Sequence, residues 1–155
     1  MRLLRVTRDA LVFQFAPREK GLLLELLRLH PRMPGRREAV SKSGHLPDQA
    51  AAQRLLEEAL AEQRAQNALQ LRKLVSDPRN WILEETHWLF TLAKADLEWT
   101  LQVLNDIRVG SWILLGSPEQ WSESVKPESA RHLWAMELAG AFQMAFLHAL
   151  EGEEE

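Results

Sequence analysis

Apolar residues recur with helical spacing in four segments of the chain and form two short strand-like runs at its start. The helical spacing predicts four helices, over residues 17–29, 48–75, 94–115 and 127–150. Residues 3–6 and 11–15 contain β-branched and aromatic side chains, and the polar residues between them predict a turn, hence a β-hairpin within 1–16. A lone hairpin is only marginally stable in water, so we expect it to pack against the helices.

Proline and glycine residues divide the predicted helices from one another. Pro17 suits the first turn of a helix, where its missing N–H costs nothing, and Pro31 ends that helix. Residues 31–47 then form a basic loop rich in Pro, Gly and Ser, and loops of that length are usually either mobile or functional. The Trp-rich segment 79–92 is ambiguous, because its apolar runs fit either a short strand or a turn of helix.

These segments predict a mainly α fold: a four-helix core with a small N-terminal β-hairpin, in a single domain over 1–155 that ends in an acidic tail at 151–155. The composition, 46% hydrophobic and 26% charged, is ordinary for a globular protein. The apolar stretch 133–150 reaches the lower limit of a membrane span, but Glu137 interrupts it and basic residues flank only its start. We therefore expect a buried core helix there and no membrane contact.

Charge is divided unevenly along the chain, although the net charge is only −3. Residues 1–42 hold ten basic and four acidic residues, whereas the remainder holds nine basic and eighteen acidic residues. This division indicates either a charged partner or attraction between the two parts of the chain itself. The basic loop would give salt-sensitive binding to phosphates, but it has no aromatic residue to stack on bases. Its basic residues are Arg32, Arg36, Arg37 and Lys42.

The second predicted helix has more polar surface than packing requires. Its apolar positions are interrupted across residues 62–67, and the gap contains the amides Gln63, Gln66 and Asn67. Together with the basic loop, this polar face forms the predicted partner surface. The predicted partner is another protein or a second copy of this chain, and nucleic acid is the less favoured alternative.

A polar cluster, Asn105, Asp106 and Arg108, lies within the strongly apolar third helix. Polar groups on a buried helix are costly unless they are paired. Arg108 lies about one helical turn from Trp112 and could form a cation–π contact with it, or it could pair with Glu137 of the fourth helix. We interpret these five residues either as a clamp that fixes how the helices dock or as a ligand or partner site.

The sequence lacks the common signatures of an enzyme or a metalloprotein. It contains no Cys, and its five His residues have no metal-ligand spacing. It has no nucleophile elbow and no glycine-rich phosphate loop. We therefore expect a non-enzymatic protein with no cofactor and no bound metal. The absence of Cys and of a secretory signal suits the cytoplasm.

Three stretches together resemble a bacterial family catalogued as domain of unknown function two thousand and seventeen. They are residues 9–15 (DALVFQF) leading into Glu19 and a Leu-rich helix, the long second helix, and the segment from Trp99 to Arg108 (WTLQVLNDIR). The resemblance covers nearly the whole chain. It implies family positions without a known role at Trp99, Leu104, Asn105, Asp106 and Arg108.

The chain departs from the family pattern after Arg108. Trp112 and Ile113 follow Gly110 and Ser111 where the pattern has a further arginine. Family members are often encoded beside the adaptor that delivers substrates to the Clp protease. The resemblance therefore implies a role near regulated proteolysis, without an activity or a cofactor.

Three functions stand as alternatives. The leading one is a non-enzymatic interaction or regulatory protein linked to Clp-type regulated proteolysis. The second is a nucleic-acid-associated protein that uses the basic N-terminal third. The third is a small-molecule binder at Asn105, Asp106 and Arg108.

Overall fold

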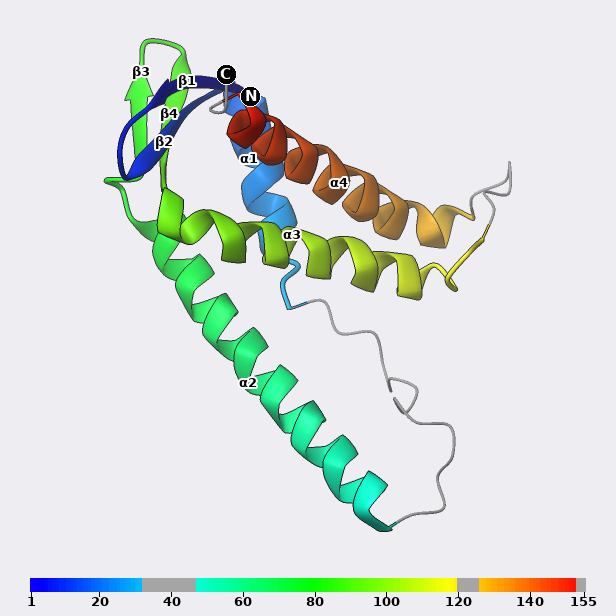
Figure 1. Ribbon diagram of the computed structural model, residues 1–155. Helices are drawn as coiled ribbons and strands as arrows, with labels where there is room; N and C mark the ends of the chain where they lie inside the picture. The colour runs from blue at the N-terminus through cyan, green and yellow to red at the C-terminus, as the bar shows by residue number, and fades with distance from the viewer. Residues whose placement is uncertain (32–46, 120–125, 153–155) are drawn as a thin grey trace.

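Two β-hairpins and four α-helices make up the part of the chain that the structure describes, which is residues 1–31, 47–119 and 126–152 of a computed structural model. Figure 1 shows the strands gathered at one end of the molecule and the helices extending away from them. The elements in chain order are β1 (Arg2–Val6), β2 (Ala10–Phe15), α1 (Pro17–Leu27), α2 (Pro47–Ser76), β3 (Trp81–Glu84), β4 (His87–Ala93), α3 (Lys94–Leu114), a 3-10 turn (Pro127–Ser129) and α4 (Ala130–Glu151).

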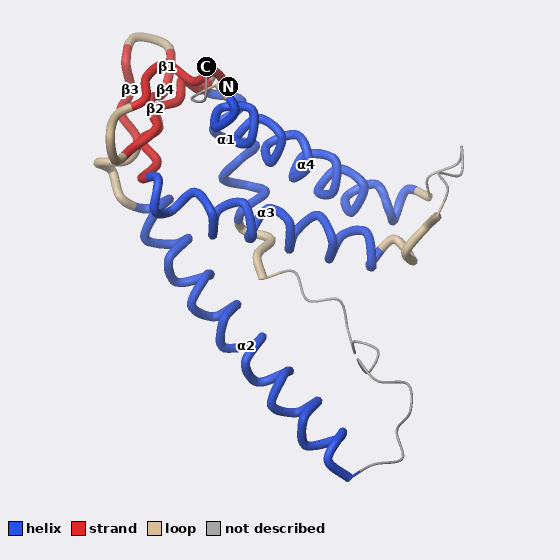
Figure 2. The backbone as a smooth tube through the Cα atoms, viewed as in Figure 1, coloured by secondary structure: helices blue, strands red, loops and turns tan. Residues whose placement is uncertain are grey.

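The four strands form one antiparallel sheet in the order β1-β2-β4-β3 (Figure 2). The prediction of a four-helix core with a single N-terminal hairpin was therefore wrong, because the ambiguous segment 79–92 folds largely as a second hairpin. Strand β4 pairs with β2, and Phe90 lies opposite Phe13 in their register. Local apolar spacing could not reveal this pairing, since α1 and α2 separate the two strands in the chain.

The predicted N-terminal hairpin and all four predicted helices are present, with small shifts at their ends. Pro17 occupies the first turn of α1, as predicted. The backbone N–H of Ala16 donates to Glu19 Oε1 at 2.9 Å, which satisfies a donor that the helix itself leaves free. α1 therefore starts at a defined point directly after β2.

Aromatic side chains on the inner face of the sheet build the centre of the core. Phe13 meets Phe146 of α4 edge to face, with ring centroids 5.1 Å apart. Phe15 contacts Trp81 and Phe90 in similar geometry, at 5.4 and 6.0 Å. Edge-to-face contacts bring the positive edge of one ring to the negative face of another. This cluster holds α4 against the sheet.

Lys20 of α1 lies over two tryptophan rings of the second hairpin. Its Nζ is 3.2 Å from the ring centroid of Trp88 and 5.0 Å from that of Trp81. A cation in this position is attracted by the negative face of the ring. Burial removes water from the amine and lowers the pKa of Lys20. The contact ties α1 to the hairpin that the sequence left ambiguous.

α4 contributes one face to the core. The buried residues of that face are Ala135, Ala139, Phe142, Phe146 and Ala149. α4 packs against α3, and its Phe142 and Phe146 contact Phe15 and Phe13 of the sheet. Within the described residues, the segment Pro127–Glu151 is the single stretch long and apolar enough to cross a membrane by length and composition. Only 28% of the most apolar 18-residue window in this stretch is buried inside the protein.

α2 packs on the rest of the protein through its C-terminal half alone. Asn67, Ala68, Leu71 and Leu74 are buried there, whereas Leu55 in the N-terminal half is 68% exposed. Figure 1 shows this half diverging from α3 and α4. The divergence leaves the side of α3 that faces α2 only partly covered.

We expect Phe146→Ala to lower the free energy of unfolding by about 3–5 kcal/mol, because it removes a fully buried ring and leaves a cavity against Phe13. Urea denaturation followed by circular dichroism measures the change. Met144→Ala, in the same helix at a residue that is 51% exposed, is the matched control and should cost less than about 1 kcal/mol. Equal costs for the two variants would contradict the assignment of this aromatic contact to the core.

Candidate functional site

A polar groove lies between the C-terminal half of α2 and the first half of α3. We call it the amide groove, because amide side chains dominate its lining. Its volume is about 580 Å³. It is lined by Leu60, Gln63, Arg64 and Asn67 of α2, by Glu98, Leu101, Gln102, Asn105 and Asp106 of α3, and by Gln143 of α4.

The amide groove brings together residues that the sequence analysis assigned to two separate features. Gln63 and Asn67 belong to the predicted partner surface, and Asn105 and Asp106 belong to the predicted polar cluster. Gln63 Nε2 donates to Asn67 Oδ1 at 3.0 Å, one turn further along the same helix. Amides both donate and accept hydrogen bonds, so the groove suits a polar backbone or polar side chains.

A second depression lies further along α3, where α2 no longer covers it. We call it the apolar hollow, and it is lined by Arg108, Val109, Trp112 and Met136. Its volume is about 420 Å³. Val109 is 39% exposed and Trp112 is 38% exposed. Large apolar side chains exposed around one depression are typical of binding surfaces rather than of a closed core.

Arg108 connects the two depressions. Its Nη2 donates to Asn105 Oδ1 at 2.9 Å, so a residue of the hollow is bonded to a residue of the amide groove. The Arg108 side chain also crosses α4 at Gly140, where its Cδ lies 3.7 Å from the position that a Cβ would take. The two depressions therefore form one continuous surface along α3.

The contacts proposed for Arg108 from the sequence do not form between the described side chains. Arg108 makes no ion pair with Glu137, which is exposed on α4 and lines neither depression. It also makes no cation–π contact with Trp112. Trp112 instead donates its indole N–H to the carbonyl of Pro118 at 3.3 Å. The reason is that Arg108 is an exposed residue, so it needs no buried counter-charge.

Asp106 makes a contact that the sequence did not indicate. Its Oδ2 lies 3.5 Å from Nε2 of His30, which follows the end of α1. The His30 side chain is fully buried, whereas that of Asp106 is 38% exposed. The pair brings the end of α1 next to the amide groove.

Part of the predicted partner surface lies outside the described residues, namely Arg32, Arg36, Arg37 and Lys42. Gln66 is exposed on α2 but does not line the amide groove. Of the described part of the predicted partner surface, only Gln63 and Asn67 line the amide groove. They lie there beside Asn105 and Asp106 of the polar cluster, and Arg108 lines the adjoining hollow.

Several residues of this surface were missed by sequence reasoning. Val109 and Met136 read as ordinary core positions, because apolar residues in an apolar helix are usually buried. Gln102 and Gln143 are single amides on α3 and α4, and only the approach of three helices brings them to one groove. The one feature of the sequence that could have indicated Gln102 and Gln143 is that each is a polar residue within an apolar helix.

No group of three or more His, Asp or Glu side chains that could hold a metal ion occurs among the residues that the structure describes. Comparison of the chain with protein-family models, with curated proteins and with solved structures gives no match. The chemistry of the α3 surface is therefore the basis for assigning a function.

We expect Arg108→Ala to change the free energy of unfolding by less than about 1 kcal/mol, because Arg108 is exposed and its bond to Asn105 competes with water. Urea denaturation of the variant and the parent chain measures it. The adjacent variant Ile107→Ala is the control, and the loss of that fully buried side chain should cost about 2–5 kcal/mol. A cost above about 3 kcal/mol for Arg108→Ala would instead indicate a buried charge pair.

Proposed function

We propose that this chain is a non-enzymatic protein that binds a partner protein along α3. The observation that carries the proposal is the apolar hollow, where an exposed Trp112 and an exposed Arg108 stand beside Val109 and Met136. Tryptophan and arginine are enriched among the residues that dominate binding energy at protein interfaces. Contact of an exposed tryptophan with water is unfavourable, and a bound partner that covers the side chain removes this apolar surface from water.

The chemistry of the surface defines the partner segment. The hollow accepts one apolar side chain, and Arg108 at its edge pairs with a carboxylate on the same segment. The amide groove, next to Arg108 through Asn105, binds polar groups of the continuing chain. The partner therefore presents an apolar anchor flanked by an acidic residue and followed by polar residues.

The setting of this function is proposed on separate grounds. The chain is free of Cys, which suits the reducing cytoplasm. A role in Clp-type regulated proteolysis rests on the family resemblance alone. Identifying the partner that the tagged chain retains from a cell lysate tests this role.

We expect Trp112→Ala to reduce capture of the partner from lysate of the source cells by about tenfold or more, because it removes a central apolar contact of the interface. Arg108→Glu should reduce capture to a similar extent, since it places a negative charge opposite the partner's carboxylate. Quantitative mass spectrometry of proteins retained by the tagged chain measures both effects. Nuclease treatment before capture removes proteins that are held only through nucleic acid.

Two variants on α2 are matched controls for this experiment. Leu55→Ala removes an exposed apolar side chain, and Arg54→Glu reverses an exposed charge, both outside the α3 surface. Capture should be unchanged by either. Capture that resists Trp112→Ala and Arg108→Glu would refute the proposed surface. Loss of all captured protein after nuclease, with strong salt dependence, would favour nucleic-acid association instead.

A further inference from the structure

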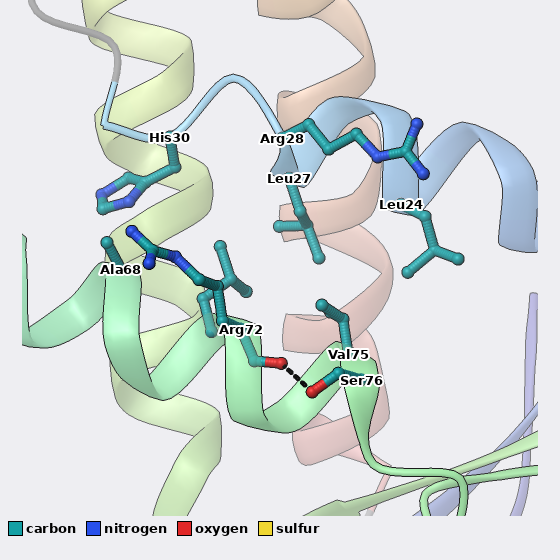
Figure 3. Close-up of a pocket in the computed structure, with 9 residues that line it drawn as sticks. Leu24, Leu27, Arg28, His30, Ala68, Arg72, Val75 and Ser76 are labelled. Atoms are coloured by element: carbon teal, nitrogen blue, oxygen red, sulfur yellow. Dashed lines mark hydrogen bonds between the residues drawn. The ribbon is translucent and has the colours of Figure 1, made fainter.

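A further pocket lies where the end of α1 meets the C-terminal half of α2. We call it the α1–α2 pocket, and its volume is about 450 Å³. Figure 3 shows that its apolar wall includes Leu24 and Leu27 of α1 and Val75 of α2. Its polar residues are Arg28, His30, Arg72 and Ser76, and the Ser76 hydroxyl donates to the backbone carbonyl of Arg72. Pockets of this size hold small organic ligands.

The two arginines of the α1–α2 pocket are both exposed, and neither has an ionic partner among the described residues. Figure 3 shows the Arg72 guanidinium pointing toward the imidazole of His30, whereas Arg28 extends over Leu24 on the other side. One side of the pocket therefore has a cation next to a ring nitrogen. On the opposite side of the pocket, the apolar Leu24 lies next to the guanidinium of Arg28.

His30 provides an independent sign of a ligand. Its side chain is fully buried, and neither ring nitrogen has a hydrogen-bond partner among the described residues. Nε2 is held only by the 3.5 Å contact with Asp106. A buried polar atom without a partner is unfavourable, because it has given up its hydrogen bonds to water. A ligand that bonds to Nδ1 would remove this cost.

We propose that the α1–α2 pocket binds an apolar carboxylate. The carboxylate lies between the Arg72 guanidinium and His30 Nδ1, and its apolar body packs on Leu24, Leu27 and Val75. Guanidinium and carboxylate match in planar geometry and in charge. Nδ1–H donates to the ligand carboxylate, and Nε2–H faces Asp106 Oδ2 at 3.5 Å on the opposite side, so the ring carries a proton on each nitrogen while the acid is bound. This pocket and the amide groove are different depressions that meet at the contact between His30 and Asp106, and the ligand-binding test of the pocket does not depend on the proposed partner.

Two classes of molecule carry a carboxylate next to an apolar group. One is a small aliphatic or aromatic carboxylic acid, and the other is the free C-terminus of a peptide that ends in an apolar residue. A phosphate group alone fits less well, because the apolar wall would remain uncovered and wetted. An alcohol of the same length fits less well, because it leaves Arg72 without a counter-charge.

Calorimetric titration with octanoate tests the proposal, and amide chemical shifts locate the binding. Octanoate should bind with shifts at Leu27, His30 and Val75, and octanol and inorganic phosphate should bind about tenfold more weakly or not at all. Arg72→Gln should weaken octanoate binding by about tenfold. Arg72 is exposed, so the variant keeps the fold, and Arg54→Gln on the same helix is the control with unchanged binding.

A peptide arm separates the two sources. Ala-Ala-Leu with a free C-terminus is compared with the same peptide carrying a C-terminal amide. If the free peptide binds more tightly than octanoate and amidation abolishes its binding, the site is assigned to a chain terminus. If octanoate binds and the peptide does not, the site is assigned to a small acid. Equal binding of octanoate and octanol, full binding by Arg72→Gln, or binding of neither octanoate nor the peptide would overturn the proposal.

Discussion

The contact of Phe13 with Phe146 joins the sheet to α4, and the arrangement of the helices depends on it. Phe13 lies on β2, which pairs with β1 in the first hairpin and with β4 of the second hairpin. α4 in turn presents Ala135 and Ala139 to its neighbours, and small residues let α3 approach closely. The α3 surface is therefore positioned by a core contact that lies outside it.

The divergence of α2 from α3 explains why a polar groove and an apolar hollow occur on one surface. Near the sheet, α2 packs close enough to bury Asn67, and amides from three helices meet there. Further along α3 the cover ends, and Val109 and Trp112 remain exposed. Under the proposed function, this arrangement would select a partner segment by the order of its residues and by its direction.

Asp106 lies between the two proposed binding sites. Its carboxylate lines the amide groove and also faces the imidazole of His30, which lines the α1–α2 pocket. A ligand that changes the position of His30 would act on Asp106 directly. The α1–α2 pocket and the amide groove therefore meet at this contact between the end of α1 and α3.

The sequence alone determined the four helices, the N-terminal hairpin and the polar character of residues 105–108, because helical spacing, proline positions and local polarity are properties of neighbouring residues. The second hairpin, the exposure of Arg108 and the pocket at His30 were decided by tertiary structure. β4 becomes a strand by pairing with β2, and Arg108 is exposed because α2 diverges. Both results depend on contacts between segments that are distant in the chain, and a local pattern holds no information about such contacts.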